Sequence, residues 1–312
     1  MNSSLNIHPD FRAIKGRALS FNRLPLALMT SLLATMNALH RRKFKTLIQV
    51  ETIPGFDGYR VPLLSIQPEN LASPSPALIY CHGGAFVMKH APQHLENAVR
   101  YAREAACTVI FVDYRLAPKW PFPAGFNDCY SALQWAASNA EKLGIDQQHI
   151  AVGGDSAGGA LAAAAVQKAA HEDGIRLCGQ MLIYPCTDAQ CRRPSSLAYV
   201  NVPPFKAASA TAMWQAYLGH EPSAGAPRYA SPIDGNLAGL PPAYVELAEF
   251  DLLHDQGHAY AEAMLAAGVG VELNEIKGTV HGFDLLAAQS GISRAAMQSR
   301  IQFLRNIWGA YK

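Results

Sequence analysis

The stretch GGDSAGGALAAAAV, residues 153–166, places one serine between glycines and just before a run of alanines. Glycine allows a sharp bend where a side chain would clash, and alanine is the best helix former. Because the stretch overlaps the apolar run IAVGG at 150–154, the pattern predicts a strand, a tight turn and a helix. Ser156 at this joint is either the N-cap of the helix or a nucleophile.

Apolar runs typical of buried strands alternate with helical patterns along most of the chain. The predicted strands are 77–81, 108–114, 150–154, 181–185, 243–250 and 269–276, and the predicted helices are 93–106, 127–143, 157–172 and 256–267. Apolar strands separated by helices predict an α/β fold with a mostly parallel central sheet covered on both faces. The stretch 51–68 predicts an antiparallel hairpin at the sheet edge, with turns at Pro54-Gly55 and Asp57-Gly58.

Two segments without core strands interrupt this alternation, and both are rich in helical patterns. Open α/β sheets bind ligands at the carboxyl ends of their strands, so both segments are predicted to form a helical cap there. The predicted organisation is an N-terminal part of the cap at 1–50, a core at 51–185, a second cap segment at 186–230, and the rest of the core at 231–312.

The N-terminal part contains the apolar stretch LPLALMTSLLATMNAL, residues 24–39, followed by HRRKFK. It is too short and too polar to span a bilayer comfortably, and no clean A-x-A site follows for a signal peptide, which stays an alternative. The residues at helical spacing are Leu28, Leu32, Leu33, Met36 and Leu39. They predict an amphipathic helix whose apolar side packs on the rest of the protein.

The overall composition is that of a folded protein with a sizeable core: 50% of the residues are hydrophobic and 16% are charged. The formal net charge is only +2. It favours neither nucleic acid nor an anionic membrane as a partner, and no basic cluster is interleaved with aromatic residues. The expected partner is a small molecule, and the sequence leaves open whether the chain forms a homodimer.

Neither the cysteines nor the histidines predict a metal site. The six cysteines form no C-x-x-C pair, which indicates a reduced, cytoplasmic protein, with a disulfide between Cys186 and Cys191 as the alternative. His254 and His258 are four residues apart in a predicted helix, but a third ligand is missing, so surface histidines are the preferred interpretation.

The motif around Ser156 has a partner upstream. Residues 154–158 fit G-x-S-x-G, in which a strand-to-helix turn exposes the serine oxygen and the next N–H, on Ala157, lies at a helix N-terminus. CHGGAF at 81–86 follows a predicted strand, where esterases often place H-G-G-G to complete an oxyanion hole. Gly83 and Gly84 can supply its N–H groups. His82 is expected to brace this loop.

A serine nucleophile needs a base and an orienting carboxylate, which in this fold follow in the order Ser, Asp or Glu, His. His281, in KGTVHGFD, comes after the last predicted strand. Asp251 follows the strand 243–250 and is therefore favoured as the acid. Asp255 is expected to cap the following helix.

Taken together, the motifs resemble the hormone-sensitive-lipase-like carboxylesterases, bacterial esterase family IV, of the α/β-hydrolase fold. The matching motifs are HGGAF (82–86), DYRLAP (113–118), GDSAGG (154–159), YPCTD (184–188), DLLHDQG (251–257) and HGF (281–283). The resemblance covers essentially the whole chain and is strongest from about Pro54 onward.

The resemblance implies a catalytic triad, an oxyanion hole and no metal or organic cofactor. The implied residues are Ser156 as nucleophile, Asp251 as acid, His281 as base, and Gly83, Gly84 and Ala157 around the oxyanion. The chain departs from the family at Ala85, where the third glycine of H-G-G-G stands, and at Lys119, where a glutamate is usual. Ala85 is expected to narrow the acyl pocket without removing an N–H, whereas the effect of Lys119 is not predicted.

The sequence therefore predicts a serine esterase acting on short- to medium-chain acyl esters, with Phe205, Trp214 and Tyr217 of the cap around an apolar substrate pocket. Amides, thioesters and acetylated sugars are alternative substrates because they react through the same kind of tetrahedral intermediate. A ligand-binding protein on this fold is disfavoured because serine, acid and histidine are all present. A lipase at an oil interface would need a larger exposed apolar lid than the composition suggests.

Overall fold

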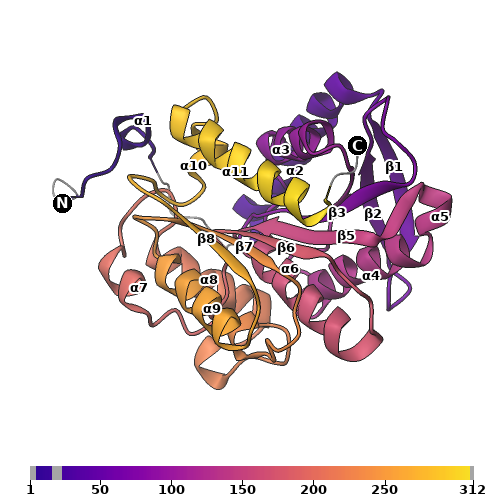
Figure 1. The fold of residues 1–312 in the computed structure, drawn as a ribbon. Coiled ribbons are helices and arrows are strands. Elements are labelled where there is room, and N and C mark those ends of the chain that lie inside the picture. Colours follow the sequence, from indigo (N-terminus) through magenta and orange to yellow (C-terminus); the bar gives the residue numbers. More distant parts are fainter. Residues whose placement is uncertain (1–4, 16–22, 310–312) are drawn as a thin grey trace.

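The computed structural model describes residues 5–15 and 23–309, and its centre is an eight-stranded sheet with helices on both faces (Figure 1). The strands are β1 (Ile48–Pro54), β2 (Arg60–Ile66), β3 (Ser75–Cys81), β4 (Thr108–Val112), β5 (Ile145–Asp155), β6 (Gly179–Ile183), β7 (Ala243–Ala248) and β8 (Val271–Ile276). Their order is β1-β2-β4-β3-β5-β6-β7-β8. β1 and β2 form the predicted antiparallel edge hairpin, and β3 to β8 pair in parallel. The predicted mostly parallel sheet is confirmed.

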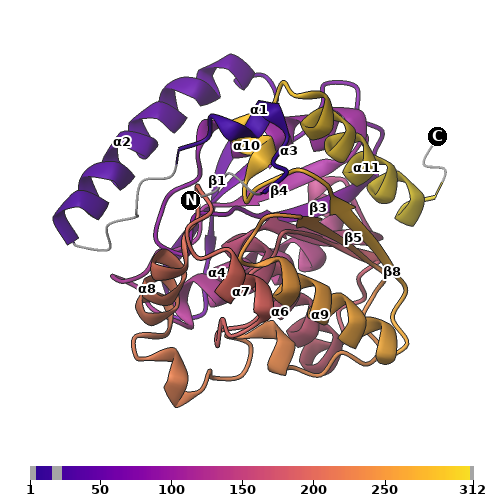
Figure 2. The same ribbon diagram turned by 90° about the vertical axis from the view of Figure 1, so that its left-hand side faces the viewer.

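The longer helices divide between the two faces of the sheet. The helices are α1 (Pro9–Arg12), α2 (Arg23–Arg41), α3 (Pro92–Glu104), α4 (Ala124–Ser138), α5 (Ala140–Leu143), α6 (Ala157–Lys168), α7 (Pro194–Ala198), α8 (Ala207–Leu218), α9 (His254–Ala266), α10 (Phe283–Leu286) and α11 (Gly291–Ile307). α4, α6 and α9 share one buried cluster, and α3 and α11 share the other. Figure 2 shows α6 and α9 across the sheet from α3 and α11.

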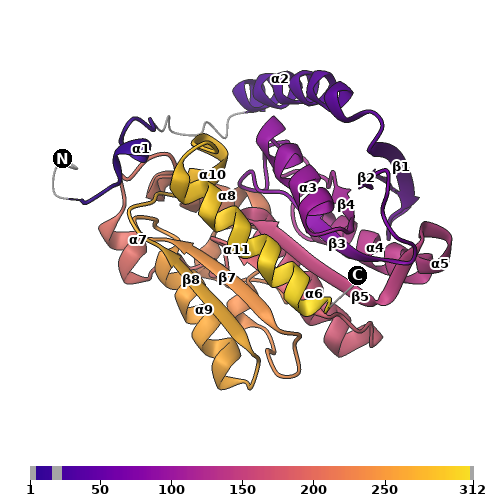
Figure 3. The same ribbon diagram turned by 45° about the horizontal axis from the view of Figure 1, so that its top comes forward.

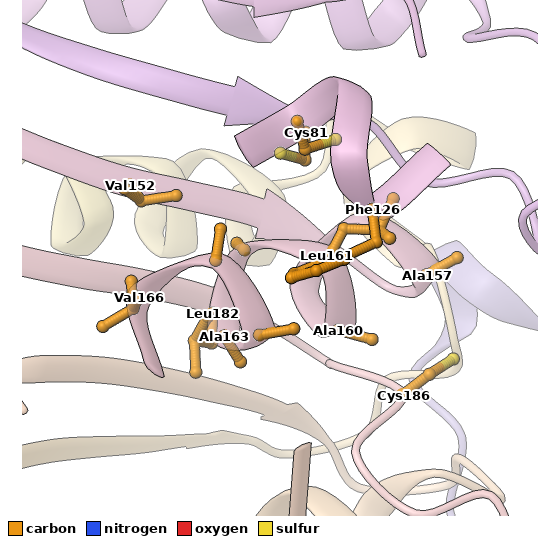
Figure 4. Close-up of a cluster of buried hydrophobic side chains, with 14 of the residues drawn as sticks. Cys81, Phe126, Val152, Ala157, Ala160, Leu161, Ala163, Val166, Leu182 and Cys186 are labelled. Atoms are coloured by element: carbon orange, nitrogen blue, oxygen red, sulfur yellow. The ribbon is translucent and has the colours of Figure 1, made fainter. Parts of the chain in front are cut away.

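The two clusters follow from the alternation of side chains along each strand. In β3, Leu78 and Tyr80 enter the cluster under α3 and α11, whereas Ile79 enters the one under α4 and α6. The alanines of α6 let this helix lie close to the sheet, and Leu161 belongs to the same buried cluster as Val152 and Phe126 (Figure 4). The stretch that opened the sequence analysis is therefore a central strand and a buried helix.

Two of the predicted helices differ in detail from the observed ones, and one long observed helix was not predicted, besides the short α10. The predicted helix 127–143 is split at Asn139 into α4 and α5. The predicted helix 157–172 leaves α-helical geometry after Lys168 and ends in a π-helical turn at Ala169–Asp173. The unpredicted helix is α11, whose core-facing residues include a fully buried arginine, Arg300, that interrupts its apolar stripe.

The predicted N-terminal helix exists as α2, but its predicted packing face is wrong. The helix contacts α3 beneath it with the side that carries Leu26 and Asn37, both buried (Figure 3). The leucines expected to pack, Leu28, Leu32 and Leu39, are exposed. Within the described residues, no helix is both long enough and apolar enough to cross a membrane.

Candidate active site

The residues singled out from the sequence converge at one edge of the sheet. Ser156 follows β5, Asp251 follows β7, His281 follows β8, and the 82–86 loop follows β3. These strands are parallel, so their carboxyl ends meet at the same edge, as can be followed in Figure 1. This edge is the candidate active site.

Ser156 occupies a strained turn between β5 and α6. Its φ of 54° and ψ of −119° define a backbone conformation that costs a non-glycine residue about 1–3 kcal/mol. Its side chain makes no capping hydrogen bond, so the N-cap interpretation is wrong. A Cβ atom on Gly154 or Gly158 would overlap the carbonyl oxygen of Cys81, so these two glycines let α6 and β3 approach each other. Such strain at a buried serine is typical of a functional site.

A chain of hydrogen bonds joins the serine, the histidine and the acid. Ser156 Oγ lies 2.9 Å from His281 Nε2, and His281 Nδ1 lies 2.6 Å from Asp251 Oδ2. Asp251 is buried, and its other oxygen accepts the Leu253 N–H at 3.0 Å, which fixes the carboxylate. The three residues predicted as a triad are therefore brought together. Asp255 does not cap α9 and instead accepts the backbone N–H of Ser195 at 2.8 Å.

Among these three hydrogen-bonded residues, His281 is the one whose pKa matters most for the reaction. Burial disfavours charge on the ring, but the Asp251 carboxylate outweighs it, and the pKa of His281 is raised above its usual 6.5. The carboxylate also fixes the tautomer that leaves Nε2 free to accept the serine proton. The imidazolium that forms during reaction is thereby stabilised.

We expect kcat/KM to fall as the pH drops through an apparent pKa above 6.5, because only neutral His281 can accept a proton. Because the pKa of His281 is raised, kcat/KM should begin to fall at a higher pH than it would with an ordinary histidine. The pH–rate profile of a water-soluble ester checks this. In the residual activity of Asp251→Asn the acid limb should move to lower pH, since the carboxylate that raises the pKa is gone. A wild-type acid limb below 6.5 would contradict the prediction.

The structure changes the predicted oxyanion hole in one position. The N–H of Gly83 donates to Asp155 Oδ1 at 3.0 Å and is therefore not free to bind an oxyanion. In the described part of the chain, no acceptor is found for the N–H groups of Gly84 and Ala85. The Ala157 N–H is in the first turn of α6 and has no intrahelical acceptor. Gly84, Ala85 and Ala157 are thus the available donors.

The two departures from the family have different surroundings. Ala85 has a φ of 54°, a left-handed conformation that costs alanine about 1–2 kcal/mol, which explains why glycine is usual there. Lys119 is exposed, and its Nζ lies 5.5 Å from the ring centroid of Trp120. The alanine keeps the N–H that the oxyanion hole needs, as expected from the sequence.

Asp155 anchors the oxyanion loop from behind. Besides the Gly83 N–H, it accepts the Tyr80 hydroxyl at 2.8 Å, and its Oδ2 lies 3.1 Å from His94 Nε2. Burial would raise the pKa of Asp155, but His94, Tyr80 and Gly83 outweigh it and hold the pKa at about 2. Burial likewise opposes charge on His94, yet the carboxylate raises the pKa of His94. The carboxylate next to the nucleophile is thus a fixed charge that positions the loop.

Asp155→Asn should lower kcat by about 10- to 100-fold with little change in KM, because loop position affects oxyanion binding and not ester binding. Steady-state kinetics separate the two parameters. The matched control is Asp146→Asn, which cuts another His–Asp pair (2.9 Å to His149) near the opposite end of β5 from Asp155 and should leave kcat unchanged. A rise in KM alone in Asp155→Asn would show that Asp155 does not position the loop.

His82 braces the same loop, as predicted. It is fully buried, its ring stacks on Tyr114 at 4.4 Å and on Phe111 at 5.7 Å, and its Nδ1 contacts the Gly83 carbonyl at 2.6 Å. Burial and the neighbouring histidines push the pKa of His82 well below its usual value. The ring therefore stays neutral and does not exchange protons with a substrate.

The three aromatic residues predicted to bind substrate differ in position. The Phe205 ring lies 5.2 Å from the His281 ring and is next to the candidate site. Tyr217 stacks on Phe86 at 3.8 Å, and Trp214 lies 5.4 Å from the same ring. Trp214 exposes none of its surface, so it cannot line a water-accessible pocket in this state. Trp214 and Tyr217 hold the oxyanion loop in place, and only Phe205 remains a candidate for substrate contact.

The thiols and histidines near the site form no disulfide or metal centre. Cys186 and Cys191 are both free, and Cys186 Sγ lies 4.0 Å from Ser156 Oγ. His254 contacts Asp255 and Glu275 at the protein surface. Among residues 5–15 and 23–309, no group of three or more His, Cys, Asp or Glu side chains is arranged to hold a metal ion.

The fold and this site define a class of protein, and comparison with known proteins agrees. The chain belongs to a family described as alpha/beta hydrolase fold, whose model matches residues 78–285, and within it to the hormone-sensitive-lipase-like esterases. It is 40% identical over 231 residues to an ethyl acetate hydrolase of Pseudomonas putida, covering 73% of this chain and 72% of that protein. It is 38% identical over 237 residues to carboxylesterase NlhH of Mycobacterium tuberculosis, covering 75% and 74%.

Solved structures give the same result over nearly the whole chain. A bacterial heroin esterase is 34% identical, with a TM-score of 0.84 over 98% of this chain and 99% of that one. Esterase LipW from Mycobacterium marinum is 29% identical, with a TM-score of 0.87 over 98% and 97%. The resemblance inferred from the motifs is therefore confirmed at the level of the family.

Sequence reasoning missed several residues that support the site. His94 carried no motif, although it is the partner of Asp155. Tyr184 lies in a matched motif, but nothing in the sequence showed that its ring would sit 4.9 Å from that of His281 while its hydroxyl donates to Asp284 at 2.5 Å. These contacts join distant segments, and local patterns do not encode them.

Proposed function

We propose that the chain is a serine carboxylesterase that hydrolyses short- to medium-chain acyl esters through an acyl-enzyme intermediate. The observation that carries the proposal is the continuous hydrogen-bonded chain from Ser156 through His281 to Asp251. Relatives named as carboxylesterases and an ethyl acetate hydrolase support the ester class. The family model matches residues 78–285, which include all three side chains and the loop 82–86.

In the first half of the reaction, Ser156 Oγ attacks the ester carbonyl while His281 Nε2 takes the hydroxyl proton. The N–H groups of Gly84, Ala85 and Ala157 bind the oxyanion. Collapse of the tetrahedral intermediate breaks the bond to the alcohol oxygen, which receives the proton from His281. In the second half, water attacks the acyl-enzyme by the same route and releases the carboxylic acid. The residues themselves supply every proton transfer.

We further propose that residues 1–50 and 186–230 act as the cap over the site. Phe205 belongs to the second segment and lies beside His281, and Tyr217 of the same segment stacks on the oxyanion loop. Large apolar side chains packed this closely leave room for a short acyl chain in preference to a long one. Six free thiols, four of them buried, suit a reducing compartment, so we propose a cytoplasmic location.

Hydrolysis of p-nitrophenyl esters from acetate to palmitate tests this function. Turnover should peak at short or medium chains, and Phe205→Ala should shift the peak toward longer chains because it removes bulk next to His281. Lys206→Ala, one residue further along the chain, is the matched control and should leave the peak in place. Well-folded protein that turns over no ester, or that prefers palmitate, would overturn the proposal.

A further inference from the structure

The outward face of α2 is an apolar stripe that no described residue covers. Leu28, Leu32, Met36 and Leu39 are 65%, 61%, 43% and 56% exposed. Their spacing of four, four and three residues places them on one side of a helix. The opposite side is fastened to the protein, since Asn37 Nδ2 donates to the His90 carbonyl at 2.6 Å. The helix is thus held by one face and presents the other to its surroundings.

Along the sequence, positive charge is concentrated in the N-terminal segment that contains this helix. Residues 11–50 contain eight Lys and Arg and no Asp or Glu, whereas the other 272 residues carry 18 Lys and Arg against all 24 Asp and Glu, a net charge of −6. Arg42, Lys43 and Lys45 follow the end of α2 directly, and all three are exposed. The net charge of +2 conceals a strongly basic segment attached to an acidic body.

We propose that α2 docks this stripe on the surface of an anionic phospholipid bilayer. An amphipathic helix with an apolar face and a basic flank lies in the plane of the interface, with its apolar side chains in the acyl boundary. Each Lys or Arg near an anionic surface adds to the attraction. Arg42, Lys43 and Lys45 would then contact lipid phosphates. The expectation of no membrane partner relied on the net charge of the whole chain. That net charge does not show that the positive charges are concentrated in one segment.

A second copy of the chain fits this face less well. Symmetric dimers usually bring the same patch of both subunits together. Here that would bring together the exposed Arg42, Lys43 and Lys45 that follow α2 in each copy, and the repulsion between them would oppose association. An anionic lipid surface has the opposite charge and accepts the stripe without that repulsion.

Co-sedimentation of the full chain with vesicles tests the proposal. We expect binding to phosphatidylcholine vesicles that contain about one-third phosphatidylglycerol, little binding to pure phosphatidylcholine, and release by about 0.5 M NaCl. Leu32→Ser with Leu39→Ser, and separately Arg42→Glu with Lys43→Glu, should each weaken binding at least about tenfold. All four side chains are on the surface, so these variants should fold with a thermal stability close to that of the wild type.

Matched controls change the same residue types elsewhere. Leu197→Ser with Leu265→Ser alters two leucines that are 69% and 51% exposed, and Lys142→Glu with Arg192→Glu reverses two exposed charges. Both control pairs should bind vesicles like the wild type. Equal loss in variants and controls, or no binding to anionic vesicles, would overturn the proposal. So would a dimer in sedimentation velocity that Leu32→Ser with Leu39→Ser dissociates.

Discussion

Ser156→Ala is expected to lower kcat for ester hydrolysis by about 10⁵- to 10⁶-fold, the loss seen when a serine of such a unit is removed. The Oγ atom lies 2.9 Å from His281 Nε2, and alanine leaves neither a nucleophile nor a proton for the histidine to take. The measurement is the turnover of a p-nitrophenyl ester of medium chain length. The side chain makes no capping bond, so thermal unfolding should show a stable fold.

The neighbouring thiol provides the matched control for Ser156. Cys186 Sγ lies 4.0 Å from Ser156 Oγ and is a second nucleophilic group beside the site. Burial raises the pKa of Cys186 well above its usual value, so the thiol stays protonated and unreactive. Cys186→Ala should therefore keep kcat within about tenfold of the wild type. Loss of activity in Cys186→Ala with activity retained in Ser156→Ala would assign the nucleophile to the cysteine.

The central fold could be predicted because its signals are local. Continuous apolar strands such as β5 and glycines at a tight turn occupy a few successive residues and need no distant partner to be recognised. The packing of α2 could not be predicted in the same way. Leu26 and Leu33 lie on one side of it and Leu28 and Leu32 on the other, so periodicity identified a helix but not the face that meets the protein.

In the candidate site, too, local motifs could be predicted from the sequence and long-range contacts could not. Ser156 is recognised from five residues, and the chain order together with the position after a predicted strand then favours Asp251 as acid and His281 as base. The choice among the N–H groups of the 82–86 loop depends on Asp155, 72 residues away from Gly83 along the chain, whose oxygen takes one of them. No pattern within the loop shows which donor is already occupied.

Arg300→Met is expected to lower the free energy of unfolding by about 3–5 kcal/mol, the largest effect on stability that the described residues suggest. Arg300 is fully buried and bonds Glu246 at 2.5 and 3.0 Å and Asp284 at 2.6 Å. Methionine fills similar space but leaves two buried carboxylates without their cation. Urea unfolding at neutral pH measures the loss. Arg100→Met, which cuts a partly exposed pair with Glu104, should cost only about 0.5 kcal/mol.

Removing the two acids as well separates lost charge from lost packing at Arg300. In Arg300→Met, Glu246 and Asp284 are left as buried carboxylates without their cation. Replacing buried charged groups by uncharged ones of similar shape removes the cost of the unpaired charge. Adding Glu246→Gln and Asp284→Asn to Arg300→Met should therefore recover much of the lost free energy of unfolding. A deficit that remains in the triple variant would mean that packing, and not the uncompensated charge, explains the loss.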